Sequence, residues 1–293
     1  MKILIAIGGK EFSKPTLDLG MKIANSFKSS TTIAYVGKKI SQFSEKDVSV
    51  VHQNLDDREL YRPGIRTLEW AYDFLISKKY IKEKELNKFD DYLLVDEENS
   101  RMKVLLKGQQ SDNIDLIMRT GEIIEQLKNE VEKNNHDITI IGGGGNKGIH
   151  QKLVQFIDSS VFVVKNYSVK KTYKILLPIN ESKGSDMAIV TAINFAKSYK
   201  LDVEIISVPE NGKSIDEVEK ILSKTKEKFS KSKINSKTKI IEGSTVNSIV
   251  NYAKDNSIVI LGVSPKNPIM KYFFGSKPLS IAQKCNCPVL ITK

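Results

Sequence analysis

The feature that most constrains this chain is an apolar run at its start that recurs near its middle. Residues 1–9 read Met-Lys-Ile-Leu-Ile-Ala-Ile-Gly-Gly, and residues 172–180 read Thr-Tyr-Lys-Ile-Leu-Leu-Pro-Ile-Asn. Both runs are short, continuous and rich in β-branched residues, as is typical of strands buried on both faces of a parallel sheet. The recurrence predicts two similar α/β units in tandem.

The two halves repeat the same alternation of strand and helix patterns. After the first run, Leu17, Met21 and Ala24 share one helical face, and Ala188, Ala192 and Phe195 do so in the second half. Each half then reads β-α-β-α-β-α-β-(α)-β, which predicts doubly wound, five-stranded parallel sheets covered by helices on both faces. The further strands are expected at 31–36, 115–119, 137–141 and 160–164 in the first half, and at 203–208, 239–242, 257–261 and 288–292 in the second. The further helices are expected around 68–75, 124–131, 215–222 and 246–253.

These patterns predict a first domain over residues 1–168 and a second over 172–293, because the joint at 166–171 is short and polar. The first half is longer, and its excess lies in a charged insert near 78–110. Met102–Leu106 is a candidate extra strand within that insert. Residues 38–57 are a second irregular stretch. Both stretches are interpreted as surface elaboration, with a lid or docking surface as the alternative.

The net charge is +11 in 293 residues. Such a basic balance favours anionic partners such as nucleic acid, an anionic ligand or a membrane surface. The lysines are scattered through helices and loops, and the run at 224–228 mixes in an acid and a hydroxyl. This arrangement favours a solvated lysine-rich surface, and nucleic acid is not expected as a partner. Cys285 and Cys287 are the only cysteines, which fits a reducing, cytoplasmic compartment. We expect no signal peptide and no membrane span.

Glycines in the second half follow a pattern that places main-chain groups near a ligand. Gly262-Val-Ser-Pro265 is followed, nine residues later, by Gly275-Ser276, and the final strand begins Cys287-Pro-Val. This pattern resembles the universal stress protein family, which carries Gly-x-x-Gly, nine residues, Gly-Ser or Gly-Thr, and often a final Cys-Pro-Val. The resemblance spans the second half and most of the first, and implies an adenine-nucleotide-hydrolase-like (HUP type) fold. In ATP-binding members the glycines wrap the phosphates and ribose, and an aspartate after the first strand holds the adenine.

The second half departs from the family pattern at three positions. Pro265 replaces the second glycine and has no N–H to donate. Asn180 replaces the aspartate, and its carbonyl oxygen is expected to accept a hydrogen bond from the adenine amino group. Glu181 replaces the next glycine and would repel a phosphate if it pointed inward. Ser182 matches a common family position. Lys277, directly after Ser276, is a candidate phosphate contact or a solvated lysine.

The first half departs in the opposite way. Gly142-Gly-Gly-Gly145 satisfies Gly-x-x-Gly, but Gln155-Phe156 stands nine residues on, and the last helix is expected to be short. Gly8 and Gly9 follow the first strand, so the aspartate is absent. The resemblance therefore implies an incomplete nucleotide-type site in each half, for ATP or another adenine nucleotide. The alternative is a vestigial pair of structural pockets.

No constellation for catalysis is evident in the sequence. The histidines His52, His136 and His150 are isolated, and no nucleophile elbow or metal-ligand cluster is expected. His136 is expected at a helix C-terminus, which would favour its cation. Gly8-Gly9-Lys10 with Ser13 faintly resembles the loop of PP-loop ATP pyrophosphatases, but Ile7 and Glu11 replace its serine and aspartate. That alternative would make the chain an adenylating enzyme.

The final strands of the two halves, 160–165 and 288–293, are apolar and β-branched. In universal stress proteins such strands often pair between two domains, so we expect antiparallel pairing here, which would make the tandem a covalent pseudo-dimer. A homo-oligomer is a further expectation, and the protein partner is open. The resemblance implies a function in stress-related ligand sensing or signalling without catalysis. The alternative is a regulatory module that binds an acidic partner without nucleotide.

Overall fold

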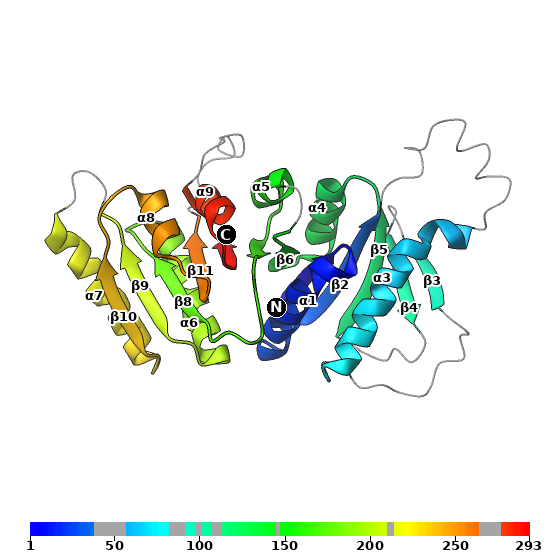
Figure 1. The fold of residues 1–293 in the computed structure, drawn as a ribbon, viewed down its shortest axis with the longest axis horizontal. Coiled ribbons are helices and arrows are strands. Elements are labelled where there is room, and N and C mark those ends of the chain that lie inside the picture. Colours follow the sequence, from blue (N-terminus) through cyan, green and yellow to red (C-terminus); the bar gives the residue numbers. More distant parts are fainter. Residues whose placement is uncertain are drawn as a thin grey trace. The chain divides into compact units, whose positions relative to one another are not determined.

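The computed structural model describes residues 1–37, 57–81, 92–97, 101–106, 113–144, 147–209, 214–263 and 277–293 (Figure 1). The chain divides into two compact units, Met1–Ile140 and Ile141–Lys293. No described helix is long and apolar enough to cross a membrane.

The first unit is a mainly parallel sheet with helices on both faces. Its strand order is β6-β1-β2-β5-β4-β3, and β1 pairs with β2, and β2 with β5, in parallel. Helices α1 and α3 cover one face and α4 the other (Figure 1). The bounds are β1 Lys2–Ile7, α1 Lys10–Ser26, β2 Ser30–Gly37, α3 Asp57–Ser77, β3 Tyr92–Glu97, β4 Arg101–Leu106, β5 Ile114–Thr120, α4 Ile123–Asn134 and β6 Ile138–Gly142.

The second unit repeats this plan. Its strand order is β10-β9-β8-β11-β12-β7, with every pair parallel except β12 and β7. Helices α6 and α7 cover one face, and α8 and α9 the other (Figure 1). The bounds are α5 Lys147–Phe156, β7 Ser160–Val164, β8 Lys174–Pro178, α6 Lys183–Tyr199, β9 Val203–Ser207, α7 Ile215–Lys231, β10 Ser236–Ile240, α8 Thr245–Tyr252, β11 Ser257–Gly262, α9 Lys277–Lys284 and β12 Val289–Thr292.

The two repeated apolar runs form the central strands of the two cores. Ile3–Ile5 in β1 and Ile175–Leu177 in β8 are fully buried. Helices on both faces remove every side chain of such a strand from water, which is why the runs are continuously apolar rather than alternating. The doubly wound α/β class expected from the sequence is therefore confirmed.

The insert of the first half adds two antiparallel strands at the edge of the sheet. The expected strand at Met102–Leu106 is β4, and β3, which was not predicted, pairs with it as a hairpin. Arg101 Nε of β4 lies 3.1 Å from Glu130 Oε2 of α4. The same oxygen lies 2.6 Å from Nη2 of Arg119, and the side chains of Glu130 and Arg119 are fully buried. Through Glu130, the ion pairs with Arg101 and Arg119 link the hairpin to the core. Residues 38–56 lie outside the described part.

Two expectations about elements were wrong. β10 spans Ser236–Ile240 rather than 239–242, because this edge strand is mostly exposed and its lysines give no apolar signal. The last helix of the first half is not short, since α5 has 10 residues. What is short is the connection before it, residues 143–146, whereas residues 263–276 separate β11 from α9.

The two final strands are antiparallel neighbours within the second unit. Val161 pairs with Ile291, Phe162 with Leu290, and Val163 with Val289. Helix α5 also contacts α9. These contacts place α5 and β7 in the second compact unit, although they belong to the first half of the repeat. The boundary at 166–171 separates the two copies of the repeated strand and helix pattern, and as a domain boundary it stays a prediction.

Candidate functional site

The candidate site of the second half begins where β8 ends and α6 starts. Ser182 is the N-cap of α6, with φ −87° and ψ 151°, and its Oγ accepts a hydrogen bond from Ser185 N. A serine at this position satisfies one of the first N–H groups of the helix. The remaining N–H groups and the helix dipole make such a helix start suited to an anion.

The carboxamide of Asn180 is turned toward this loop. Its Oδ1 accepts from Ser182 N at 3.1 Å, from Ser182 Oγ at 2.6 Å and from Ser185 Oγ at 2.8 Å. A main-chain N–H can only donate, so the group facing it must be the oxygen. This oxygen is therefore engaged within the loop, and its contact with an adenine amino group stays a prediction. The Nδ2 of the same carboxamide is a donor.

The first half builds the same turn without polar side chains at its tip. Gly8 N donates to Ser13 Oγ at 2.9 Å, as Asn180 N donates to Ser185 Oγ at 3.0 Å. Sequence reasoning assigned this role to neither serine, although a serine five residues after the turn begins is visible in each half. Gly9 is the N-cap of α1 and makes no side-chain cap. A Cβ added to Gly8 would meet no atom within 4 Å.

Gly262, the first glycine of the pattern, has a packing role. A Cβ at this position would lie 1.7 Å from the carbonyl oxygen of Gly184, in the first turn of α6. The absence of side chains at these two glycines lets the end of β11 approach the start of α6. This contact brings Gly262 to the same sheet edge as Asn180 and Ser182.

The remaining positions of the glycine pattern in the second half are only partly described. Gly275, Ser276 and Pro265 lie outside the described residues. Lys277 is the first residue of α9 and is exposed. Lys277 thus stands at a helix start, and its role as a phosphate contact or a solvated lysine stays a prediction.

In the first half the glycine pattern has a different context. Gly142 ends β6, and Gly145 lies outside the described residues. A Cβ on Gly143 would lie 2.1 Å from Cγ of Lys165, so this glycine serves packing. Gln155 and Phe156 end α5, so they are not counterparts of Gly275 and Ser276. The family spacing of nine residues does not locate the counterparts in the first half, because the connection from β6 to α5 is shorter than that from β11 to α9.

His136 is structural rather than cationic. It is buried, with Nδ1 3.2 Å from Glu130 O and Nε2 3.1 Å from Thr32 Oγ1. Burial lowers its pKa, although the nearby Glu130 opposes this effect. The expectation of a favoured cation was wrong because desolvation outweighs the helix end. His52 and the side chain of His150 lie outside the described residues.

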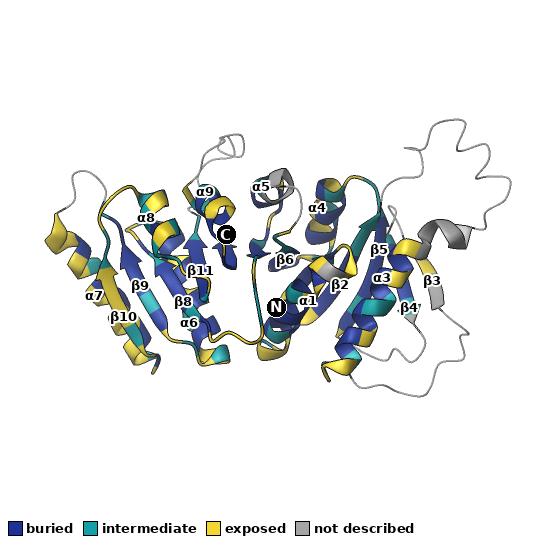
Figure 2. Ribbon diagram, viewed as in Figure 1, coloured by how far each residue is buried: buried dark blue, intermediate teal, exposed yellow. Residues whose placement is uncertain are grey.

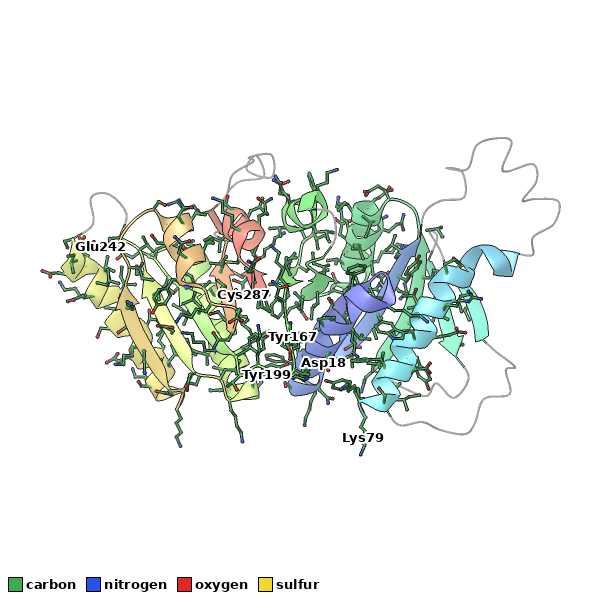
Figure 3. The ribbon with its side chains drawn as sticks, in the orientation of Figure 1. Asp18, Lys79, Tyr167, Tyr199, Glu242 and Cys287 are labelled. Atoms are coloured by element: carbon green, nitrogen blue, oxygen red, sulfur yellow. The ribbon has the colours of Figure 1, made fainter. Side chains whose placement is uncertain are left out.

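The two cysteines are free thiols buried just before β12, with Cys287 labelled in Figure 3. The hydrogen bond between the thiols lowers the pKa of Cys285 and raises that of Cys287. Among the described residues, no group of three or more His, Cys, Asp or Glu side chains is arranged to hold a metal.

The turn between β8 and α6 offers hydrogen-bond donors at a helix start, which is the chemistry of binding an anionic ligand.

The fold defines a tandem α/β protein whose second half brings the end of β11 and the start of α6 to one sheet edge. Residues 172–293 match the model of the Universal stress protein family. This match covers the second half of the repeat. No curated protein matches the chain.

Solved structures share the fold over the whole length. A universal stress protein from Archaeoglobus fulgidus is 14% identical, with TM-score 0.61, covering 100% of this chain and 96% of that one. A putative universal stress protein from Pseudomonas aeruginosa is 13% identical, with TM-score 0.59, covering 100% and 92%. The cytoplasmic domain of a prokaryotic cation chloride cotransporter is 11% identical, with TM-score 0.50, covering 99% and 94%. These likenesses establish the fold, and a fold serves more than one function.

Proposed function

We propose that this protein is a tandem stress-response regulator that binds ATP or another adenine nucleotide in its second half and carries no catalytic machinery. The observation that supports this is the asymmetry between the two halves. Only the second half combines a polar turn at Asn180 and Ser182 with a long connection, residues 263–276, before its last helix. A phosphate chain needs such a connection to be enclosed by main-chain N–H groups.

The same asymmetry makes the first half a structural partner rather than a second site. Its turn presents Gly8 and Gly9 only, and its connection is limited to residues 143–146. The adenylating alternative has less support, because Gly9 is the cap of α1 and Ser13 is buried under Gly8. Buried free thiols fit a reducing cytoplasm, where we place the protein.

We further propose that the tandem acts as a covalent pseudo-dimer through β7 and β12. The pairing is reciprocal, as in a two-fold interface, because equivalent positions of the two strands exchange partners around Phe162 and Leu290. Lys165, after β7, donates to Cys285 O beyond α9. Lys293, after β12, donates to Ile157 O beyond α5. Each final strand thus caps the last helix of the other half.

Calorimetry on the whole chain with ATP, AMP and cyclic di-AMP tests the nucleotide site. We expect saturable binding by the wild type and at least a tenfold loss in Gly275→Val. Gly8→Ala is the matched control, since a Cβ there enters open space. It should bind like the wild type. If the wild type binds none of the three, both pockets are vestigial and the proposal fails.

Asn180→Asp then identifies what the turn recognises. An aspartate keeps one oxygen for Ser182 and Ser185 and turns a second acceptor toward the ligand. If the ligand offers an adenine amino group there, affinity should rise about threefold or more, because an acceptor meets a donor. A fall in affinity would show that the ligand presents an acceptor to Asn180.

A further inference from the structure

The outer edge of the second unit carries an open strand. β10 pairs in parallel with β9, and no described strand lies on its other side. Val203 N donates to Asn235 O at 3.0 Å, and Ile241 N donates to Ser207 O at 2.9 Å. Main-chain groups alternate in direction along a strand, so the odd-numbered residues face β9. The N–H and C=O groups of Ser236, Thr238 and Ile240 therefore face the open edge.

The first half shows what such an edge accepts. β5 is the repeat counterpart of β10, because Thr31 pairs with Ile114 as Val203 pairs with Ser236. In the first half this edge is filled by β4, which pairs antiparallel with β5. The β5 strand is accordingly buried, whereas β10 is exposed (Figure 2).

The charges at the two edges are reversed. Across the filled edge, Lys103 Nζ of β4 lies 2.6 Å from Asp115 Oδ1 of β5. The residue of β10 that corresponds to Asp115 is Lys237, since both follow the first residue of their strand. By the same geometry, a strand added to β10 would place an acidic side chain against Lys237. Opposite charges on neighbouring strands stabilise pairing, and like charges disfavour it.

Helix α7 concentrates more positive charge beside this strand. Residues 224–239 contain seven lysines and one glutamate, and thus six of the chain's eleven net positive charges. Helix α7 packs on β10, and all seven lysines are exposed. The packing of α7 on β10 therefore gathers the lysines of this stretch near one edge of the sheet. We call β10 with Lys224, Lys226, Lys231 and Lys233 the basic edge, whereas Lys228 Nζ lies 3.6 Å from Asp186 Oδ1 of α6.

The carboxylate of Glu204, on the neighbouring strand β9, is already engaged by other groups. Glu204 of β9 accepts hydrogen bonds from Lys174 Nζ and from Tyr252 Oη. Lys239 Nζ lies over the ring of Tyr252, 4.8 Å from its centroid, which holds this lysine in place beside the edge. Glu204 therefore does not neutralise the basic edge by itself.

We propose that the basic edge binds an acidic, extended polypeptide segment of a protein partner, which adds to the sheet as an antiparallel strand beside β10. The main-chain groups of Ser236, Thr238 and Ile240 form the ladder, and Lys237 and Lys239 select carboxylates. The lysines disfavour apolar or basic strands, including a second copy of β10. This interaction is separate from the nucleotide site and does not depend on it.

The test uses the whole chain and a capped seven-residue peptide that alternates valine and glutamate, with binding followed by fluorescence anisotropy. Thr238→Pro removes an N–H that faces the open edge and leaves the pairing with β9 intact. Lys237→Glu with Lys239→Glu reverses the charge. Lys197→Glu with Lys200→Glu, on exposed lysines at the end of α6, is the matched charge control. Circular dichroism verifies the fold of each variant.

We expect saturable peptide binding that weakens with salt, falls at least tenfold in Thr238→Pro and in the double reversal at 237 and 239, and persists in the control. A peptide with N-methylated valines should also fail to bind. Absence of binding by the wild type would overturn the proposal. So would binding that is indifferent to Thr238→Pro and is competed by poly-U RNA, which would identify a polyanion surface. Wild-type dimerisation that Thr238→Pro abolishes would assign the edge to a second copy instead.

Discussion

At the scale of single residues, Gly262 of the ligand-binding glycine pattern has a packing role, because it allows β11 to approach α6 closely. Gly262 lies so close to Gly184 that a Cβ at position 262 would be 1.7 Å from a carbonyl oxygen. The approach is between two main-chain segments, which cannot yield as a flexible side chain can. This glycine therefore supports the site by placing β11 against α6.

Gly262→Ala should lower the free energy of unfolding by roughly 3 kcal/mol or more, because the added methyl group forces a strand and a helix apart. Gly8→Ala places its methyl group in open space and should change stability by less than about 0.5 kcal/mol. Urea denaturation compares the two. Equal effects would contradict the packing role of Gly262.

His136 should make the stability of the chain sensitive to mild acid. Its pKa is lowered in the folded state by burial, from an ordinary value of 6.5. The stabilisation is present above pH 6.5 and is lost as the pH falls through the folded pKa, because the unfolded chain takes up the proton first. A difference of one pKa unit between the two states is worth about 1.4 kcal/mol.

Urea denaturation at pH 7.5 and 5.5 measures this effect. The wild type should lose more stability between the two values than His136→Gln, which keeps hydrogen-bonding groups but does not titrate. A variant with the same pH dependence as the wild type would show that other groups cause the loss.

At the scale of elements, the ends of β7 and α9 stabilise each other through one lysine. Lys165 Nζ donates to Ala282 O at 2.7 Å, to Gln283 O at 2.9 Å and to Cys285 O at 3.3 Å. These carbonyls end α9, where unpaired acceptors and the negative end of the helix dipole favour a cation. The interaction joins the final strand of one half to the final helix of the other.

Lys165→Met should destabilise the chain by about 1–2 kcal/mol, since the methionine keeps the apolar stem but donates to no carbonyl. Lys170→Met, on an exposed lysine, should have almost no effect. Thermal unfolding distinguishes them. If Lys165→Met is as stable as the control, the cap contributes little and solvent satisfies the carbonyls.

At the scale of the whole molecule, β7 covers an edge of β12 that would otherwise be open. The register centres on Phe162 opposite Leu290, which occupy equivalent positions in the two final strands. A chain without β7 would present β12 to the solvent. A second copy of β12 is a suitable partner, because the same antiparallel geometry places Leu290 opposite Leu290.

The fragment 172–293 should therefore dimerise, and light scattering coupled to gel filtration should give twice its monomer mass. The midpoint of dissociation should shift with concentration, as mass action requires. A folded fragment that stays monomeric at high concentration would show that β12 needs β7 for reasons other than edge pairing, and would weaken the pseudo-dimer proposal.

The class and order of most elements can be predicted from the sequence, because burial selects apolar residues at regular positions along a strand or helix. Ile3–Ile5 and Ile175–Leu177 are apolar at every position since both faces of their strands are covered. Leu17, Met21 and Ala24 likewise recur with the period of a buried helix face. The strand at Met102–Leu106 was found in the same way. β10 was misplaced because an exposed edge strand leaves no such mark.

Only the tertiary structure decided the chemistry of the edges. The direction of the Asn180 carboxamide depends on which donors surround it, and two of them belong to Ser182. The role of Gly262 depends on Gly184, far away in the chain. The lysines of 224–239 became one surface because a helix and an edge strand pack together. Such properties arise from specific contacts between groups in space, whereas sequence patterns record mainly the burial of each residue alone.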